Sequence, residues 1–336
     1  MVLPSTTRQW FYPRFGSYNE LVLHEVPMAL PKANEVLVKT HAVSLQYRDL
    51  MIANKLYPGH LQENLVPCSD MAGEVIAVGA DVKEWHVGDR VAANFFADKL
   101  HDEYTQEIRE SAFGGALQGS LVRIPAHLSY EEASTLPCAA VTAYNAFLSG
   151  FEPIKAGDTI LVQGTGGVSI FALQFAVVAG ATVIATSSDN EKLKVATRLG
   201  AKHVINYKTT PAWDKEVLRL TNGRGVDRVI EVAGNVTLER SVASTRYGGS
   251  IDIIGAVADV NASPPNTIFD ILFKGLNIRG IHVGSVQQFK DMNRMIEANA
   301  EATRPVIDRV FPFEEAKAAF AHMKGQTHVG KVVIKL

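Results

Sequence analysis

The strongest constraint on the fold is the alternation of strand-like and helix-like segments that begins after Pro125. The strand-like runs are continuous and rich in β-branched residues, which is typical of strands covered by helices on both faces. The expected strands are 159–163, 182–186, 203–206, 227–232, 250–254 and 277–283. The expected helices lie at about 167–179, 190–199, 213–222 and 236–246. This pattern predicts an α/β fold built on a doubly wound parallel sheet.

The chain before Pro125 shows a different pattern. Its short β-rich runs are separated by Gly, Pro and Asp and include 35–40, 74–79, 88–91 and 119–125. Polar and apolar residues alternate there, which indicates an antiparallel sheet with one face exposed. The 336 residues have the length of two domains at roughly 100 to 200 residues each. We therefore predict a β-rich domain at 1–127, an α/β domain at 128–284, and a return to the first domain at 285–336, with a helix at 286–300 and a strand at 331–335.

The charge balance limits the possible partners. Thirty-three Lys and Arg face 35 Asp and Glu, so the net charge of −2 offers no bulk attraction to nucleic acid or an anionic membrane. Cys68 and Cys138 are too few for a disulfide framework and favour a reducing compartment. The sequence shows neither an apolar leader nor a run of about 18 apolar residues. We expect a cytoplasmic protein that acts on small molecules.

A glycine-rich loop follows the first strand of the α/β domain. It consists of Gly164, Thr165, Gly166, Gly167 and Val168. Glycines at a strand-to-helix junction permit a tight turn and let the backbone approach an anion at the helix N-terminus. Ser169 replaces the third glycine of the usual pattern. The loop predicts a binding site for the pyrophosphate of a dinucleotide.

The end of the second strand bears on which dinucleotide binds. An NAD site normally carries an acidic residue there, about 20 positions on, to bind the ribose 2′-hydroxyl. This strand instead ends in Ser187 and Ser188, and Asp189 is expected to cap the next helix. The two hydroxyl groups and the following Lys192 could bind a 2′-phosphate by hydrogen bonds and charge. The alternative interpretation of Lys192 is a solvated lysine on the helix surface. The pattern favours NADP(H) over NAD(H).

Several motifs together resemble the medium-chain dehydrogenase/reductase superfamily over nearly the whole chain. They are the glycine loop and the segments 69–73, 88–91, 136–144 and 199–207. The resemblance implies a GroES-like β-rich catalytic domain, a Rossmann domain that binds the nicotinamide cofactor, and hydride transfer in the cleft between them.

This sequence differs from the zinc-binding members of the superfamily at the positions of the catalytic zinc ligands. Zinc alcohol dehydrogenases of this superfamily hold catalytic zinc with a Cys, a His and a Cys or Asp. Gln46 stands where the first cysteine would be and Ser69 where the histidine would be, so only Cys138 matches. One such ligand cannot hold a catalytic zinc, and the absence of cysteines between Cys68 and Cys138 excludes the lobe that binds structural zinc. The chain is therefore similar to the zinc-free branch, which includes NADPH-dependent quinone oxidoreductases and enoyl reductases.

The same branch implies roles for individual residues. Lys192 and Tyr207 match positions that contact the adenosine phosphate. Thr142 corresponds to a residue near the nicotinamide, although it also reads as an ordinary helix-face residue, and Gly255 ends the strand beside it. His282, near the sixth strand, is a weaker candidate for approach to the nicotinamide.

The catalytic candidates lie near residue 50. Without zinc, hydride addition to a conjugated double bond is the less demanding reaction, because hydrogen-bond donors can stabilise the charge that moves onto oxygen. Tyr57 matches the tyrosine that donates a proton in enoyl thioester reductases of this superfamily, and it also reads as a packing residue in a Tyr-Pro turn. Gln46 stands where the zinc-free branch usually carries Asn and would orient the substrate or the nicotinamide amide. Arg48 and Asp49 are expected to form an internal ion pair.

The sequence therefore predicts an NADPH-dependent, zinc-independent oxidoreductase that transfers hydride to a quinone or an α,β-unsaturated carbonyl compound. A zinc-independent alcohol dehydrogenase or carbonyl reductase, and a non-catalytic NADPH-binding module, remain alternatives. The sixth strand would pair edge to edge across a two-fold axis, as is common in this superfamily, and so predicts a homodimer.

Overall fold

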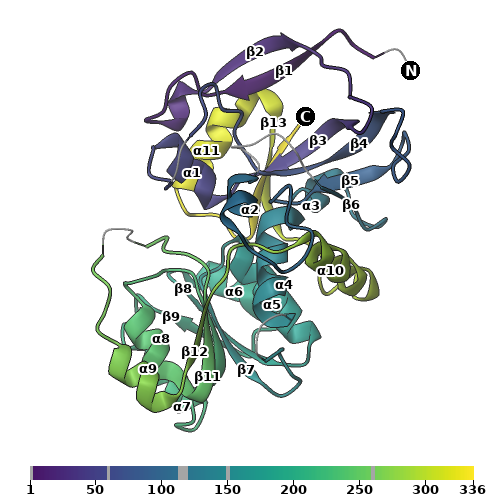
Figure 1. Cartoon of the computed structure of the whole chain (residues 1–336). Coiled ribbons are helices and arrows are strands. Elements are labelled where there is room, and N and C mark those ends of the chain that lie inside the picture. The colour runs from purple at the N-terminus through teal and green to yellow at the C-terminus, as the bar shows by residue number, and fades with distance from the viewer. Residues whose placement is uncertain (1–2, 59–60, 113–119, 149–151, 259–261) are drawn as a thin grey trace. The chain divides into compact units, whose positions relative to one another are not determined.

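The computed structural model describes residues 3–58, 61–112, 120–148, 152–258 and 262–336 (Figure 1). The chain divides into two units. Unit 1 comprises Met1–Cys138, Ser285–Glu297 and Ile307–Leu336, and unit 2 comprises Ala139–Gly284 and Ala298–Val306. No helix among the described residues combines the length and apolarity that a membrane crossing requires.

Unit 1 is built on a six-stranded sheet with the order β13-β14-β3-β4-β5-β6. The strands are β3 (Val36–Ser44), β4 (Asp70–Val78), β5 (Arg90–Ala93), β6 (Leu121–Arg123), β13 (Ile307–Pro312) and β14 (Lys331–Lys335). Only β13 and β14 run parallel, and the other pairs are antiparallel as predicted. Residue 119, where the last predicted run begins, lies outside the described residues.

Among the described residues, unit 1 also contains a second, two-stranded sheet and five α-helices. The added elements are β1 (Thr6–Phe11), β2 (Val22–Pro27), α1 (Tyr47–Ala53), α2 (Gln106–Glu110), α3 (Tyr130–Ala133), α10 (Val286–Ala298) and α11 (Ala316–Lys324). A hydrophobic core that includes Tyr12, Leu45, Phe311 and Phe320 joins α1 and α11 to the sheet. This core holds α1, which begins directly after the catalytic candidate Gln46 and ends before the second candidate, Tyr57.

Unit 2 contains a six-stranded sheet with the order β12-β11-β10-β7-β8-β9. Its strands are β7 (Thr159–Gln163), β8 (Thr182–Ser187), β9 (His203–Asn206), β10 (Val226–Glu231), β11 (Thr245–Ile253) and β12 (Asn277–Gly280). All neighbours are parallel, which confirms the predicted doubly wound sheet. The strand order reverses between β7 and β10, because the chain runs outward through β8 and β9 and then returns to the other side of β7.

Helices cover both faces of this sheet. They are α4 (Val141–Leu148), α5 (Gly167–Val178), α6 (Asn190–Arg198), α7 (Trp213–Leu220), α8 (Leu238–Ser244) and α9 (Ile268–Lys274). In Figure 1, α4, α5 and α6 lie on one side of the sheet and α7, α8 and α9 on the other. Leu161, Ile184, Val229 and Ile251 are fully buried between these layers, which explains the continuous apolar strands of the sequence.

The structure differs from the sequence prediction at several elements, and two of them lie near the edge of the unit 2 sheet. The strand β12 ends at Gly280 rather than at 283, and the backbone of Val283 adopts a φ of 52°, which is incompatible with an extended strand. The helix α9 was not predicted. Ile268, Phe269 and Phe273 of this helix are exposed, so the apolar residues do not follow the one-sided pattern of an ordinary surface helix.

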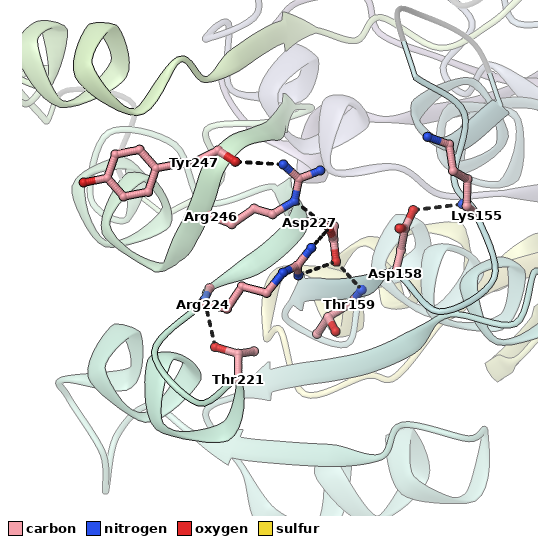
Figure 2. Close-up of polar contacts among 9 residues, drawn as sticks. Lys155, Asp158, Thr159, Thr221, Arg224, Asp227, Arg246 and Tyr247 are labelled. Carbon is pink, nitrogen blue, oxygen red and sulfur yellow. Dashed lines mark hydrogen bonds and ion pairs between the residues drawn. The ribbon is translucent and has the colours of Figure 1, made fainter.

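An ionic network joins the amino ends of β7 and β10 (Figure 2). The Asp227 carboxylate accepts hydrogen bonds from Arg224 (2.7 and 3.0 Å), from Arg246 Nε (2.6 Å) and from the Thr159 N–H (2.8 Å). Figure 2 shows both guanidinium groups directed at this carboxylate. Burial raises the pKa of Asp227, but these donors outweigh burial and hold the pKa well below its ordinary value. The network lies at the opposite end of the strands from the glycine loop.

Candidate functional site

The glycine loop follows β7 directly and provides an open position at the start of α5. Gly164 adopts a φ of 75°, a conformation that favours glycine, and Gly166 is the N-cap of α5. A Cβ added at Gly166 would meet no atom within 4 Å, so this side of the loop is open. The first-turn N–H groups of a helix lack intrahelical acceptors and attract anions. The loop therefore fits a dinucleotide pyrophosphate.

Ser169, which replaces the third glycine of the pattern, has a structural role. Its Oγ donates a 2.7 Å hydrogen bond to the Gln163 carbonyl and so ties the first turn of α5 to the end of β7. Thr165 is 5% exposed, and its hydroxyl oxygen lies 3.5 Å from the hydroxyl oxygen of Ser187. The loop is thereby connected to both β7 and β8.

The residues predicted to bind the adenosine phosphate gather at the ends of β8 and β9. Ser187 is the buried last residue of β8, and its carbonyl accepts a 3.0 Å hydrogen bond from the Tyr207 N–H, just after β9. Asp189 caps α6, because its carboxylate accepts hydrogen bonds from the backbone N–H groups of Glu191 (2.7 Å) and Lys192 (3.2 Å). The structure thus brings Thr165, Ser187 and Tyr207 together in unit 2 and places Lys192 in the first turn of α6.

The other two cofactor candidates lie elsewhere in unit 2. Thr142 is buried in the first turn of α4. Gly255 follows β11, and a Cβ at this position would lie only 2.9 Å from the Val232 carbonyl oxygen. The close approach explains why glycine stands here, and it joins the loops that follow β10 and β11.

In unit 1, Gln46 is tied to a buried carboxylate. Its Nε2 donates to Asp70 Oδ2, and its backbone N–H donates to Asp49 Oδ2 (2.7 Å) at the start of α1. Asp70 also accepts hydrogen bonds from Ser69 Oγ (2.7 Å), the Cys138 N–H (3.2 Å) and Ser44 Oγ (3.4 Å). Gln46 was predicted as a site residue, whereas Asp70 was not, although it lies inside the 69–73 motif.

Buried charges surround this hydrogen-bond cluster. Burial raises the pKa of Asp49 to about 6 and also raises the pKa of Asp70. Lys331 of β14 donates to the Leu45 carbonyl (2.6 Å), and burial lowers its pKa while Asp70 opposes that effect. The lysine and the two carboxylates offset one another inside unit 1, because each would be costly to bury alone.

The residues of this cluster do not fit a zinc ion. Burial raises the pKa of both Cys68 and Cys138, which holds them as thiols, whereas zinc binds the thiolate. Gln46 and Ser69, which the resemblance predicts at two of the ligand positions, supply neutral side chains. Across the described residues, no three His, Cys, Asp or Glu side chains are grouped so that they could hold a metal ion.

Tyr57 belongs to a cluster of aromatic and cationic side chains in unit 1. The Arg48 guanidinium carbon lies 4.7 Å from the centre of the Tyr57 ring and 5.1 Å from that of Phe95. Burial raises the pKa of Tyr104, and Tyr57 nearby adds to the rise. Arg48 thus contacts two aromatic rings. The sequence indicated an ion pair of Arg48 with Asp49 but did not predict these ring contacts.

The comparisons with known proteins agree with this architecture. The family described as alcohol dehydrogenase GroES-like domain matches residues 32–135, and the one described as zinc-binding dehydrogenase matches residues 167–298. A zinc-type alcohol dehydrogenase-like protein of Schizosaccharomyces pombe is 48% identical over 327 residues, which cover 93% of this chain and 94% of that protein. A quinone oxidoreductase of Sus scrofa is 29% identical, with 96% of each chain covered. A solved structure from Sinorhizobium meliloti 1021, provisionally assigned as an alcohol dehydrogenase, is 35% identical, with a TM-score of 0.90 and full coverage of both chains.

Proposed function

Because this chain belongs to the medium-chain dehydrogenase/reductase superfamily of oxidoreductases, we propose that it transfers hydride from NADPH to a quinone or an α,β-unsaturated carbonyl compound without zinc. The observation that carries the proposal is the Gln46–Asp70 hydrogen bond, because the resemblance to the superfamily implies that Gln46 stands where zinc members carry a cysteine ligand. The similarity to quinone oxidoreductases over 96% of the chain supports the same branch.

The preference for NADPH rests on the ends of β8 and β9. Asp189 is engaged in capping α6, so the carboxylate that would bind a ribose 2′-hydroxyl is used elsewhere. Ser187 and Tyr207 lie together at the strand ends, and Lys192 follows in the first turn of α6. Hydroxyl groups with a lysine suit a phosphate better than a neutral ribose.

The chemistry requires a hydride and a proton. The nicotinamide supplies the hydride when it is bound. Hydride addition to the β-carbon of an enone breaks the carbon–carbon π bond and moves its electron pair toward the carbonyl oxygen, where a hydrogen-bond donor stabilises the charge. Tyr57 donates a hydrogen bond or a proton to this oxygen, and Gln46, held by Asp70, orients the substrate. Quinone reduction follows the same balance, with the charge developing on a ring oxygen.

The proposal is tested by following NADPH absorbance with a quinone, an enone and an aldehyde in parallel, before and after dialysis against a chelator. We expect turnover of the quinone or the enone, unchanged by chelation. Turnover of the aldehyde alone would favour the alcohol dehydrogenase alternative, which the name of the Schizosaccharomyces pombe relative supports. Activity that disappears with the chelator and returns with Zn²⁺ contradicts zinc independence. Tight NADPH binding with no consumption across the panel would favour the non-catalytic module.

We also propose that two copies associate through the edge of the unit 2 sheet. β12 is the outermost strand and pairs with β11 on one side. The helix that precedes β12 in the chain, α9, packs against β11, and its Ile268, Phe269, Leu272 and Phe273 are each 66–74% exposed. An edge strand flanked by exposed apolar side chains attracts another strand, and a second copy related by a two-fold axis supplies one with the same apolar surface.

A further inference from the structure

A fully buried carboxylate lies at the carboxyl end of β10. Glu231 is 0% exposed, and each of its oxygens accepts more than one hydrogen bond. Oε1 accepts from the N–H groups of Ala233 (3.0 Å) and Gly234 (2.9 Å) and from Thr237 Oγ1 (2.7 Å), and Oε2 accepts from Gln163 Nε2 (2.7 Å) and Ser241 Oγ (2.5 Å). All five donors are neutral. A buried charge held in this way is costly unless every donor is in place, so the arrangement strongly restricts the local geometry.

Gln163 carries this network across to the glycine loop. Its Nε2 donates to Glu231 and to Ser241 (2.8 Å), and its Oε1 accepts from the Val232 N–H (3.2 Å). Its own carbonyl accepts from Ser169 of α5. Gln163 directly precedes Gly164. Both polar atoms of its side chain are hydrogen-bonded, and these bonds link the start of the glycine loop to the end of β10.

The two residues lie where the strand order of the sheet reverses. Gln163 ends β7 and Glu231 ends β10, directly after the paired residues Val162 and Ile230. Open α/β sheets bind their ligands in the crevice at this point, outside the carboxyl ends of the strands. Glu231 also binds the N–H of Gly234, whose added Cβ would lie 2.7 Å from the Ala256 Cα, next to Gly255. Glu231 thus connects the loops that follow β7, β10 and β11.

We propose that Glu231 and Gln163 are positioning residues that fix the spacing of these loops and so preset the crevice for the dinucleotide, an inference that rests on the proposed NADPH binding. Neither residue needs to touch the cofactor. The carboxylate is required because it only accepts hydrogen bonds, whereas an amide of the same shape would turn an NH₂ group toward N–H and O–H donors.

The first test is the isosteric substitution Glu231→Gln, with NADPH affinity measured by fluorescence titration and calorimetry. We expect the NADPH dissociation constant to rise about tenfold or more, because donors at the crevice lose their acceptor. Adenosine 2′-monophosphate, which carries the 2′-phosphate and no part of the pyrophosphate, should bind nearly as it does to the wild type, because its expected contacts lie at β8 and β9. Equal losses for both ligands would mean that the network holds the whole unit rather than the crevice.

The matched control is Asp227→Asn, which alters a carboxylate at the other end of the same strand. This control should lower the melting temperature and leave the NADPH dissociation constant unchanged. Should Glu231→Gln fail to fold, Ser241→Ala removes one donor to Glu231 and one acceptor of Gln163, and a rise of about two- to fivefold in the NADPH dissociation constant is expected. An unchanged NADPH affinity in the folded variant overturns the inference. A wild-type protein that binds neither NADPH nor NADH would instead refute the proposed function.

Discussion

The side-chain amide of Gln46, at the start of α1, donates a hydrogen bond to Asp70 at the start of β4. Asp70 also accepts hydrogen bonds from Ser69 and from the Cys138 N–H, which hold its carboxylate in place. The held carboxylate in turn fixes the orientation of the Gln46 amide. A carboxamide held in one orientation can present its oxygen as a directed acceptor, which a freely rotating glutamine cannot do.

Asp70→Asn should therefore lower kcat/KM about tenfold while the NADPH dissociation constant stays unchanged, since the substitution disturbs the orientation of Gln46. Ser44→Ala is the comparison variant, because it removes a weak donor to Asp70 at 3.4 Å together with a 2.9 Å hydrogen bond to the Ser134 carbonyl, and leaves the Gln46 contact in place. Steady-state kinetics together with fluorescence titration would check this. Equal losses in both variants would assign Asp70 a purely structural role.

Lys192→Ala should raise the NADPH dissociation constant about tenfold and affect NADH little, because a lysine that binds the 2′-phosphate has no corresponding partner in NADH. Lys194→Ala on the same helix is the control. Lys194 pairs with Glu191 at 2.6 Å, and both side chains are largely exposed, so its removal should change neither dissociation constant. Equal weakening of NADPH and NADH by Lys192→Ala would mean that the phosphate site lies elsewhere.

Tyr57→Phe should reduce turnover of an enone about 100-fold, because the substitution removes the hydroxyl and keeps the ring under Arg48. The NADPH dissociation constant should not change. Tyr104→Phe, in the same aromatic cluster, tests whether the loss of any nearby hydroxyl has this effect. Single-turnover kinetics would separate the chemical step from product release. A wild-type rate in Tyr57→Phe would exclude this residue from proton donation.

The parts of the fold that follow from local pattern were predictable from the sequence. Continuous β-branched strands required burial on both faces, and the residues Ile184 and Val229 are indeed fully buried. The Asp189 cap followed from its place before a helix. These inferences needed only neighbours in the sequence.

The polar networks were not predictable in this way. The partners Gln163 and Glu231 are 68 residues apart, and Gln46 and Asp70 are 24 apart. No periodicity links such residues, because their contact is created by the order of strands in the sheet. The helix α9 was missed for a related reason, since most of its apolar side chains are exposed and Ile271 packs against the core.

Asp227→Asn should destabilise the protein by about 2 kcal/mol at pH 7, because it removes the negative charge that pairs with Arg224 and Arg246 and replaces one accepting oxygen by an NH₂ donor. The folded-state pKa of Asp227 is depressed, so its contribution to stability is fully present above the unfolded value of 3.8 and is lost as the pH falls toward the folded value. Urea denaturation from pH 7 to pH 3 would check this. The difference in the free energy of unfolding between wild type and variant should be constant near pH 7 and should shrink below about pH 4. A difference that grows on acidification would contradict the assignment.

Phe273→Glu should convert the proposed dimer to a monomer, because a charge in an apolar interface repels its symmetry mate and must be desolvated. Phe273 is 74% exposed, so the substitution should cost a single copy little stability. Tyr247→Glu is an informative comparison, since Tyr247 is similarly exposed at 73% but lies in β11 rather than in α9. Sedimentation equilibrium would give the mass of each variant. A wild-type protein that stays monomeric at micromolar concentration would exclude pairing through β12, whereas dissociation by Phe273→Glu alone would locate the contact at the α9 face.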